Sequence, residues 1–274
     1  MKTSLFITIV SLFLLTSGSL IAGKKDINTI KPEYKYAITF NTKHTYCEVL
    51  LNGVGITDNY FSNTGSISTG LTVTAFLQNN HNDFSLYVAS LDARQGIKEL
   101  REGAECNASL NINNEKESLE ITSLRAVADK DNYPTGIESK EYPVARTSEV
   151  KDMGFIDEGS SRIFEIARSV NLLKVPEWEW TKATPFNNNR ENIKALQAAY
   201  KKVWDVMNSR HFGDFKNITH IAMSEYALAD GESLDDMYAS LPYEEVFKNE
   251  NIQNVTFRVQ RKISVPKLCW WEAT

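Results

Sequence analysis

The dipeptide Asn52-Gly53 stands between two apolar runs of the chain. Both residues readily adopt the positive φ values of a type I′ turn, whose twist matches that of a two-residue β-hairpin. Period-two alternation places Cys47, Val49 and Leu51 on one face of the first run. The sequence therefore predicts a tight hairpin, and a β-rich first half built onto it.

Further short strands are predicted where apolar residues alternate or cluster between polar turns. These segments are residues 34–40, 70–77, 84–90, 106–112 and 119–127. Short strands at this spacing favour an antiparallel β-sandwich over βαβ units. The prolines in residues 133–136 and 142–143 interrupt the pattern. We therefore place the end of the sandwich domain, residues 24–150, near this point, and interpret residues 161–170 as an edge strand or a short helix.

The second half shows helical periodicity. Residues 187–189 are three asparagines that can cap a helix, and Gly231 and Ser233 are stop and start signals for two further helices. The first predicted helix has one apolar stripe, formed by Ile193, Leu196, Tyr200, Val203 and Met207. Residues 254–260 alternate as a late strand. We predict an α+β protein in which a helical domain, residues 151–274, ends in a strand that returns to the sheet.

The N-terminus resembles a cleavable export signal. Residues 1–23 have a positive start, an apolar core and small residues where a peptidase could cut. The alternative, a membrane anchor, is disfavoured because the apolar run is short for a bilayer span. We expect a periplasmic protein that is not inserted in the membrane after cleavage. The formal net charge of −5 argues against nucleic-acid partners.

The chain has three cysteines, Cys47, Cys106 and Cys269. Three single-bridge pairings are possible, and the sequence does not choose among them. We favour Cys47–Cys106, since both cysteines lie in the β-rich half and an exported protein meets oxidising conditions. The alternative is that all three are small buried apolar residues.

Catalytic and metal motifs are not found in the sequence. The four histidines lack paired ligand spacing, and there is no Gly-x-Ser-x-Gly elbow. We expect no cofactor, no metal and no enzymatic activity, although residues of a catalytic triad assemble in space and an enzyme stays a third interpretation.

Two groups of residues are candidates for binding a partner. The first is an acidic segment with Asp230, Glu232, Asp235, Asp236, Glu244 and Glu245. It fits a basic protein surface, or is simply a solvated helical face. The second is Trp178 with Trp180, which share a face in extended backbone. They are suited to a sugar ring or a protein interface, or to packing inside the fold.

Two stretches together carry a family resemblance. One is the strand at residues 46–55 with its polar loop and the strand at 71–77, and the other is the helix at 196–204 with the helices up to Tyr238. This arrangement resembles the periplasmic immunity proteins encoded beside type VI secretion effectors in Gram-negative bacteria, over about half of the mature chain. The resemblance implies a non-enzymatic protein that binds and neutralises a cognate toxin. The alternative function is a periplasmic carbohydrate-binding β-sandwich protein.

Overall fold

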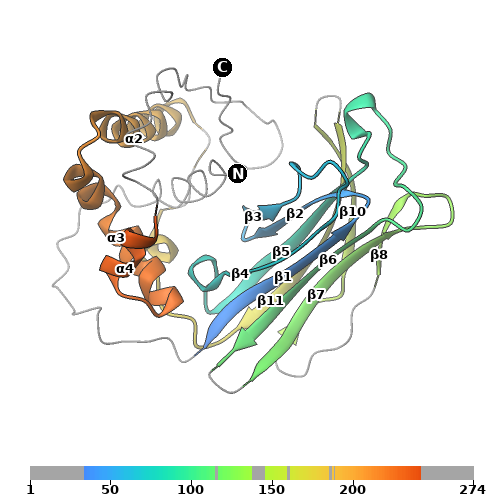
Figure 1. The fold of residues 1–274 in the computed structure, drawn as a ribbon, viewed down its shortest axis with the longest axis horizontal. Helices are drawn as coiled ribbons and strands as arrows, with labels where there is room; N and C mark the ends of the chain where they lie inside the picture. Colours follow the sequence, from blue (N-terminus) through green and yellow to red (C-terminus); the bar gives the residue numbers. More distant parts are fainter. Residues whose placement is uncertain are drawn as a thin grey trace. The chain divides into compact units, whose positions relative to one another are not determined.

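A computed structural model describes residues 34–114, 117–137, 146–158, 161–184, 187 and 189–241. Those within Pro32–Pro176 form one compact unit, the sheet unit, and those from Glu177 onward form a second, the helical unit (Figure 1). The predicted signal peptide at residues 1–23, the final strand at 254–260 and Cys269 lie outside the described residues.

The first sheet contains five antiparallel strands in the order β4-β1-β6-β7-β8. They are β1 (Lys35–Lys43), β4 (Ile67–Thr72), β6 (Glu105–Asn113), β7 (Ser118–Ala128) and β8 (Pro134–Ile137). Strand β8 corrects the interpretation of residues 133–136 as a break. Pro134 is its first residue, and a proline is tolerated at the start of an edge strand because no donor is needed there.

The second sheet is also antiparallel, with the strand order β10-β11-β5-β2-β3 and the short β9 beside β11. Its strands are β2 (Tyr46–Leu51), β3 (Val54–Asp58), β5 (Asn80–Ala89), β9 (Arg146–Thr147), β10 (Lys151–Glu158) and β11 (Ser161–Leu172). Asn52 and Gly53 join β2 to β3 with φ values of 50° and 78°. The predicted hairpin and its positive-φ turn are therefore confirmed.

The prediction of a strand at residues 70–77 is wrong for residues 73–77. Strand β4 ends at Thr72, and a 3-10 turn, η2 (Thr74–Phe76), follows. The Thr74 hydroxyl oxygen accepts a hydrogen bond from the Tyr36 N–H at 2.9 Å. In a longer strand, this N–H would bond to a backbone carbonyl oxygen of β4. A side chain has thus replaced a backbone partner, and the strand stops.

The chain divides at Pro176 and not at residue 150, where the sequence placed the domain boundary. The reason is that β10 and β11 complete the second sheet, with β11 paired to β5 from Leu172↔Asn80 to Phe164↔Val88. Residues 161–170 therefore form an interior strand, neither an edge strand nor a helix.

The two sheets are joined by a disulfide and by a side-chain hydrogen bond. A disulfide links Cys47 of β2 in the second sheet to Cys106 of β6 in the first, with their Cα atoms 6.3 Å apart. Arg168 of β11 donates from Nη1 to the Ser123 carbonyl oxygen of β7 at 3.2 Å. The largest fully buried side chains of both sheets include Phe40, Leu110, Phe84, Leu86 and Leu51. The predicted α+β class, the antiparallel first half and the Cys47–Cys106 pairing are confirmed.

Three α-helices form the described part of the helical unit, and their ends follow the predicted caps. They are α2 (Arg190–Ser209), α3 (Phe212–Asp230) and α4 (Leu234–Ser240). Asn189 accepts the Asn192 N–H, Ser233 accepts the Asp236 N–H, and Gly231 takes the left-handed φ of 66° that ends α3. In the stripe of α2, Tyr200 and Val203 are buried against Ile218 of α3.

Candidate functional site

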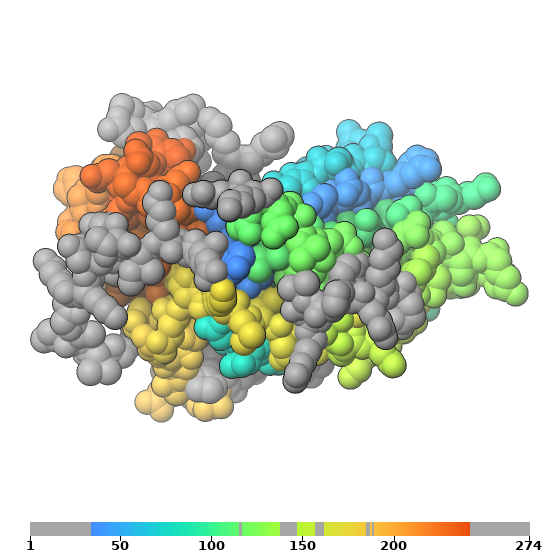
Figure 2. All heavy atoms as spheres, turned by 90° about the horizontal axis from the view of Figure 1, so that it is seen from below, coloured from blue at the N-terminus to red at the C-terminus, as the bar shows by residue number. Residues whose placement is uncertain are grey.

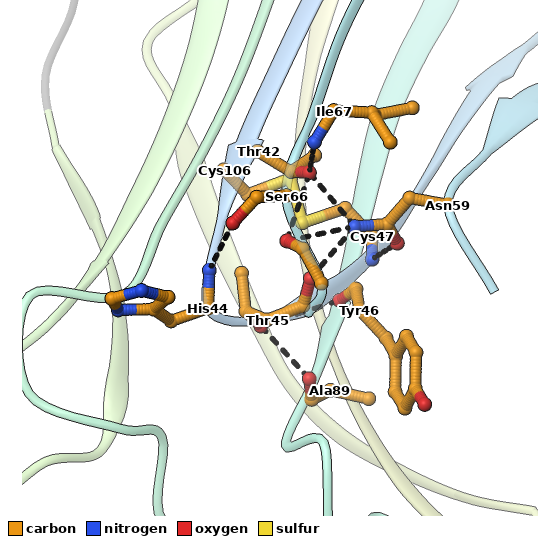
Figure 3. Close-up of a disulfide and its surroundings, with 11 residues drawn as sticks. Thr42, His44, Thr45, Tyr46, Cys47, Asn59, Ser66, Ile67, Ala89 and Cys106 are labelled. Carbon is orange, nitrogen blue, oxygen red and sulfur yellow. Dashed lines mark hydrogen bonds between the residues drawn. A yellow bond between two sulfur atoms is a disulfide. The ribbon is translucent and has the colours of Figure 1, made fainter. Parts of the chain in front are cut away.

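A loop at residues 59–66, which joins β3 of the second sheet to β4 of the first, is held by one buried side chain. Asn59 is 3% exposed. Its Oδ1 accepts the Cys47 N–H at 2.7 Å, and its Nδ2 donates to Thr42 Oγ1 and the Thr45 carbonyl oxygen, both at 2.8 Å (Figure 3). Asn59 therefore ties the loop to β1 and β2 beside the disulfide, so its base has one conformation.

Gly65 closes the same loop. Its φ is +64°, and an added Cβ would lie 2.6 Å from Leu91 Cδ2 and 2.7 Å from the Thr45 nitrogen. The Gly65 carbonyl oxygen accepts from the Thr42 hydroxyl at 3.0 Å and from Asn59 Nδ2 at 3.1 Å. Only glycine meets both the backbone conformation and the space, so the loop shape is fixed at both ends.

The tip of this fixed loop presents an aromatic side chain to solvent. Phe61 is 82% exposed, which makes it the most exposed of the large apolar side chains in the described chain. Its neighbour Tyr60 packs against β2. The Tyr60 hydroxyl donates to Glu48 Oε2 at 3.0 Å, and its ring lies edge-on to that of Tyr46 with centroids 6.0 Å apart. Residues 60–65 read Tyr-Phe-Ser-Asn-Thr-Gly. Rigid aromatic residues among small polar ones are typical of protein-recognition loops.

The base of the loop carries two carboxylates. Glu48 of β2 lies directly opposite Asp58 of β3. Burial raises the pKa of Asp58, and a hydrogen bond from the Tyr60 N–H partly offsets that shift. Both carboxylates accept from Tyr60: Asp58 Oδ1 from its N–H at 2.9 Å, and Glu48 Oε2 from its hydroxyl at 3.0 Å. The two acids therefore hold the residue that precedes Phe61.

Of the acidic segment, the structure describes Asp230, Glu232, Asp235 and Asp236, at the junction of α3 and α4, and Glu244 and Glu245 lie outside it. Asp235 and Asp236 occupy the first turn of α4, where carboxylates stabilise a helix N-terminus. Ser233 accepts the Asp236 N–H at 3.1 Å and donates to Asp236 Oδ2 at 2.6 Å. These two acids therefore have a local structural role whether or not they also meet a partner.

The tryptophan pair is not displayed on a common face. Trp178 is 1% exposed, and Trp180 is part of a 3-10 turn, η4 (Glu179–Lys182), that begins directly after Trp178. Packing inside the fold, the alternative interpretation of these residues, explains Trp178. A buried indole offers no ring face for a sugar to stack on.

Glu225 of α3 is a partly buried acid that links two elements of the helical unit. Its Oε1 accepts the Glu179 N–H at 2.6 Å, which ties η4 to α3. Burial, together with the nearby charge of Glu179, raises the pKa of Glu225 to about 7, although the Glu179 N–H and Lys182 act in the opposite direction. Lys182 itself pairs with Glu179 at 3.0 Å. Glu225 therefore titrates close to neutral pH.

Because its folded-state pKa lies above its ordinary value of 4.5, Glu225 favours folding when protonated, and this contribution is lost between pH 4.5 and pH 7. We expect the helical unit to lose roughly 1–3 kcal/mol of stability from pH 5 to pH 8. Glu225→Gln should remove most of this dependence and be the more stable form at pH 8. Urea unfolding followed by tryptophan fluorescence measures the free energy of unfolding at each pH, and the exposed Glu232→Gln is the control. If the pH dependence of stability is the same in Glu225→Gln as in the wild type, the prediction is wrong.

The described residues form an α+β protein. Two antiparallel sheets, linked by a disulfide, form the first unit, and helices form the second. Within the described ranges, no cluster of His, Cys, Asp or Glu is arranged to hold a metal ion, and no helix is long and apolar enough to cross a bilayer. No family model, curated protein or solved structure matches the chain.

The loop at residues 59–66 was not among the candidate sites derived from sequence. Its many Ser, Asn and Thr residues indicate only a connection. The available signal was the dipeptide Tyr60-Phe61 inside that polar stretch, since an aromatic residue in a surface loop is a candidate for binding.

Proposed function

We propose that this chain is an exported protein that binds and neutralises a protein toxin, as the immunity proteins of type VI secretion effectors do. The observation that carries the proposal is the fixed loop that presents Phe61. A rigid aromatic side chain loses little conformational entropy on binding and buries a large area, which is why such residues dominate the energetics of protein interfaces. Buried groups at Asn59 and Gly65 anchor the loop at both ends, which lowers the cost of ordering it on binding.

Three further features support export and protein binding. The Cys47–Cys106 disulfide suits an oxidising compartment such as the periplasm. The sheet unit, interpreted as a β-sandwich, is a scaffold that carries binding loops at the ends of its strands. The acidic segment that includes Asp230 and Glu232 would speed association with a basic toxin surface, while contributing little affinity per charge.

The carbohydrate-binding alternative was motivated by the β-sandwich and by the pair of Trp178 and Trp180. Since Trp178 is buried, that pair is not presented to a ligand. The sandwich alone does not favour a sugar over a protein as the ligand.

Phe61→Ala should weaken binding to the toxin about 30-fold or more, which corresponds to an aromatic hot spot of about 2 kcal/mol. The probe is the purified product of the reading frame next to this gene, and binding is measured by calorimetry. Protection of cells that express this toxin in the periplasm should fall in parallel. Leu173→Ala is the matched control, because Leu173 is 70% exposed in the same unit but outside the loop.

The outcomes separate the function from the site. If the wild-type protein neither binds the neighbouring product nor protects cells, the immunity function is wrong. If the wild-type protein binds and Phe61→Ala binds equally well, the function stands and the loop is not the interface. The acidic segment would then be the next surface to test.

A further inference from the structure

The strands that end the two sheets differ in how they are protected against pairing with another chain. Edge strands usually carry a proline, a charge or a bulge that prevents such pairing. Among the described strands, β8 begins with Pro134, β3 ends in Asp58 and has a bulged pairing with β2, and β10 carries Lys151 and Asp152 beside a bulge. Strand β4 reads Ile-Ser-Thr-Gly-Leu-Thr and pairs with β1 without a register shift. It has none of these protections.

The hydrogen-bonding direction of β4 is fixed at its two ends. Val73 donates its N–H to the Tyr36 carbonyl oxygen at 2.8 Å, and Ile67 donates to Thr42 Oγ1 at 3.1 Å. Odd-numbered residues of this stretch therefore face β1. Since the direction alternates along an antiparallel strand, the N–H and C=O groups of the even-numbered residues point away from β1.

These outward residues are Ser68, Gly70 and Thr72, and all three are exposed. In the space-filling view, the light-blue to cyan residues of the β3–β4 region lie at the surface of the sheet unit on the face shown (Figure 2). An exposed glycine has no side chain, so its exposure is that of its backbone. The outer edge of β4 thus presents three residues with backbone donors and acceptors.

Gly70 lies inside the strand, where the fold of a single copy does not require glycine. Its φ is outside the left-handed region, and an added Cβ would meet only the Ile38 carbonyl oxygen, at an ordinary 3.6 Å. Glycine weakens a strand, and inside one it often marks the close approach of another backbone. The described residues contain no such neighbour at Gly70.

We propose that β4 pairs antiparallel with β4 of a second copy, about a two-fold axis at Gly70. This register places Gly70 opposite itself and Ser68 opposite Thr72 of the other copy. A strand that pairs with itself brings like charges together if it carries any, so an uncharged edge is what such pairing needs. The two five-stranded sheets become continuous. An interface of one short strand is small, so the dimer is weak and concentration-dependent.

The test is sedimentation velocity of the purified protein from about 1 μM to 1 mM, the range of weak association. The wild-type protein should shift from monomer to dimer. Gly70→Lys and Gly70→Glu, each alone, should weaken self-association about tenfold or more, because like charges meet at the axis. An equimolar mixture of the two variants should regain the dimer. Ser118→Lys, on an exposed residue of β7 away from this edge, should dimerise as the wild type does.

A second variant guards against misfolding at position 70. Ser68→Pro removes a backbone donor that faces away from β1, together with an exposed side-chain hydrogen bond from Ser68 to Asn41 Oδ1. The backbone bonds between β4 and β1 are kept, so the sheet should stay intact by circular dichroism while the dimer is lost. The proposal is overturned if the wild-type protein stays monomeric at 1 mM, if the charged variants dimerise like the wild type, or if their folded mixture remains monomeric. Dimers that persist in Ser68→Pro would also overturn it, since they use another surface.

Discussion

Asn59→Ala should lower the free energy of unfolding of the sheet unit by about 3–5 kcal/mol. The side chain is buried and forms hydrogen bonds with four groups: the Cys47 N–H, the Thr42 hydroxyl and the carbonyl oxygens of Thr45 and Gly65. The Thr42 hydroxyl and the Gly65 carbonyl oxygen also bond to each other, so the loss falls mainly on the Cys47 N–H and the Thr45 carbonyl oxygen. Each buried polar group left without a partner costs about 1–3 kcal/mol. Water entering the vacated space would replace some of these bonds, which keeps the total below the simple sum.

Circular dichroism in urea is the appropriate measurement, because the two units are distinguishable by spectroscopy. All five tryptophans lie outside residues 32–176, so tryptophan fluorescence follows the helical unit while the β-sheet signal follows the sheet unit. Asn63→Ala is the control, since Asn63 is an exposed residue of the same loop and should change stability by less than about 0.5 kcal/mol. A loss below about 1 kcal/mol in Asn59→Ala would show that water holds the loop equally well.

Local signals in the sequence predicted local structure well. Asn52-Gly53 specifies a two-residue turn because few other pairs accept positive φ at both positions. The caps at Asn189 and Ser233 and the stop at Gly231 were predictable for the same reason, since each satisfies backbone groups within a few residues. The Cys47–Cys106 pairing was favoured only because both cysteines lie in the β-rich half, and the structure confirms it.

Features that depend on distant parts of the chain were not predictable. Arg168 is an example: a charged residue in residues 161–170 suggests a surface position, yet it is buried and donates to the carbonyl oxygens of Ser148 and Ser123. Those partners come from other segments, so periodicity could not identify β11 as an interior strand. The boundary expected at residue 150 was wrong for the same reason.

The candidate site was missed because its two main residues have burial opposite to what their residue types suggest. Phe61 is an exposed residue, and Asn59, which fixes it, is a polar residue that sequence analysis assigns to solvent. Only the fold reveals that Asn59 is buried against Cys47 and Thr42. Conversely, the acidic segment was easy to see in the sequence, but part of it is explained by the capping of α4.

Reduction of the Cys47–Cys106 disulfide should lower the stability of the sheet unit by about 4 kcal/mol. The two cysteines are 59 residues apart in sequence, and the bond closes a loop of that size in the unfolded chain. On the chain-entropy account, most of the stabilisation comes from the restricted unfolded state. A freed unfolded chain also exposes more surface, so the dependence of the unfolding free energy on urea, the m-value, should rise on reduction.

A loss of stability together with a higher m-value would show that the disulfide acts by restricting the unfolded chain. Because both cysteines are buried, the protein is reduced in denaturant and refolded with reductant before the urea titration. If the bond acted through native contacts alone, stability would fall while the m-value stayed constant. Cys269→Ser should behave as the oxidised wild type does, since it leaves the Cys47–Cys106 bond intact. A loss below about 1 kcal/mol with an unchanged m-value would mean that other contacts hold the sheet unit together without the bond.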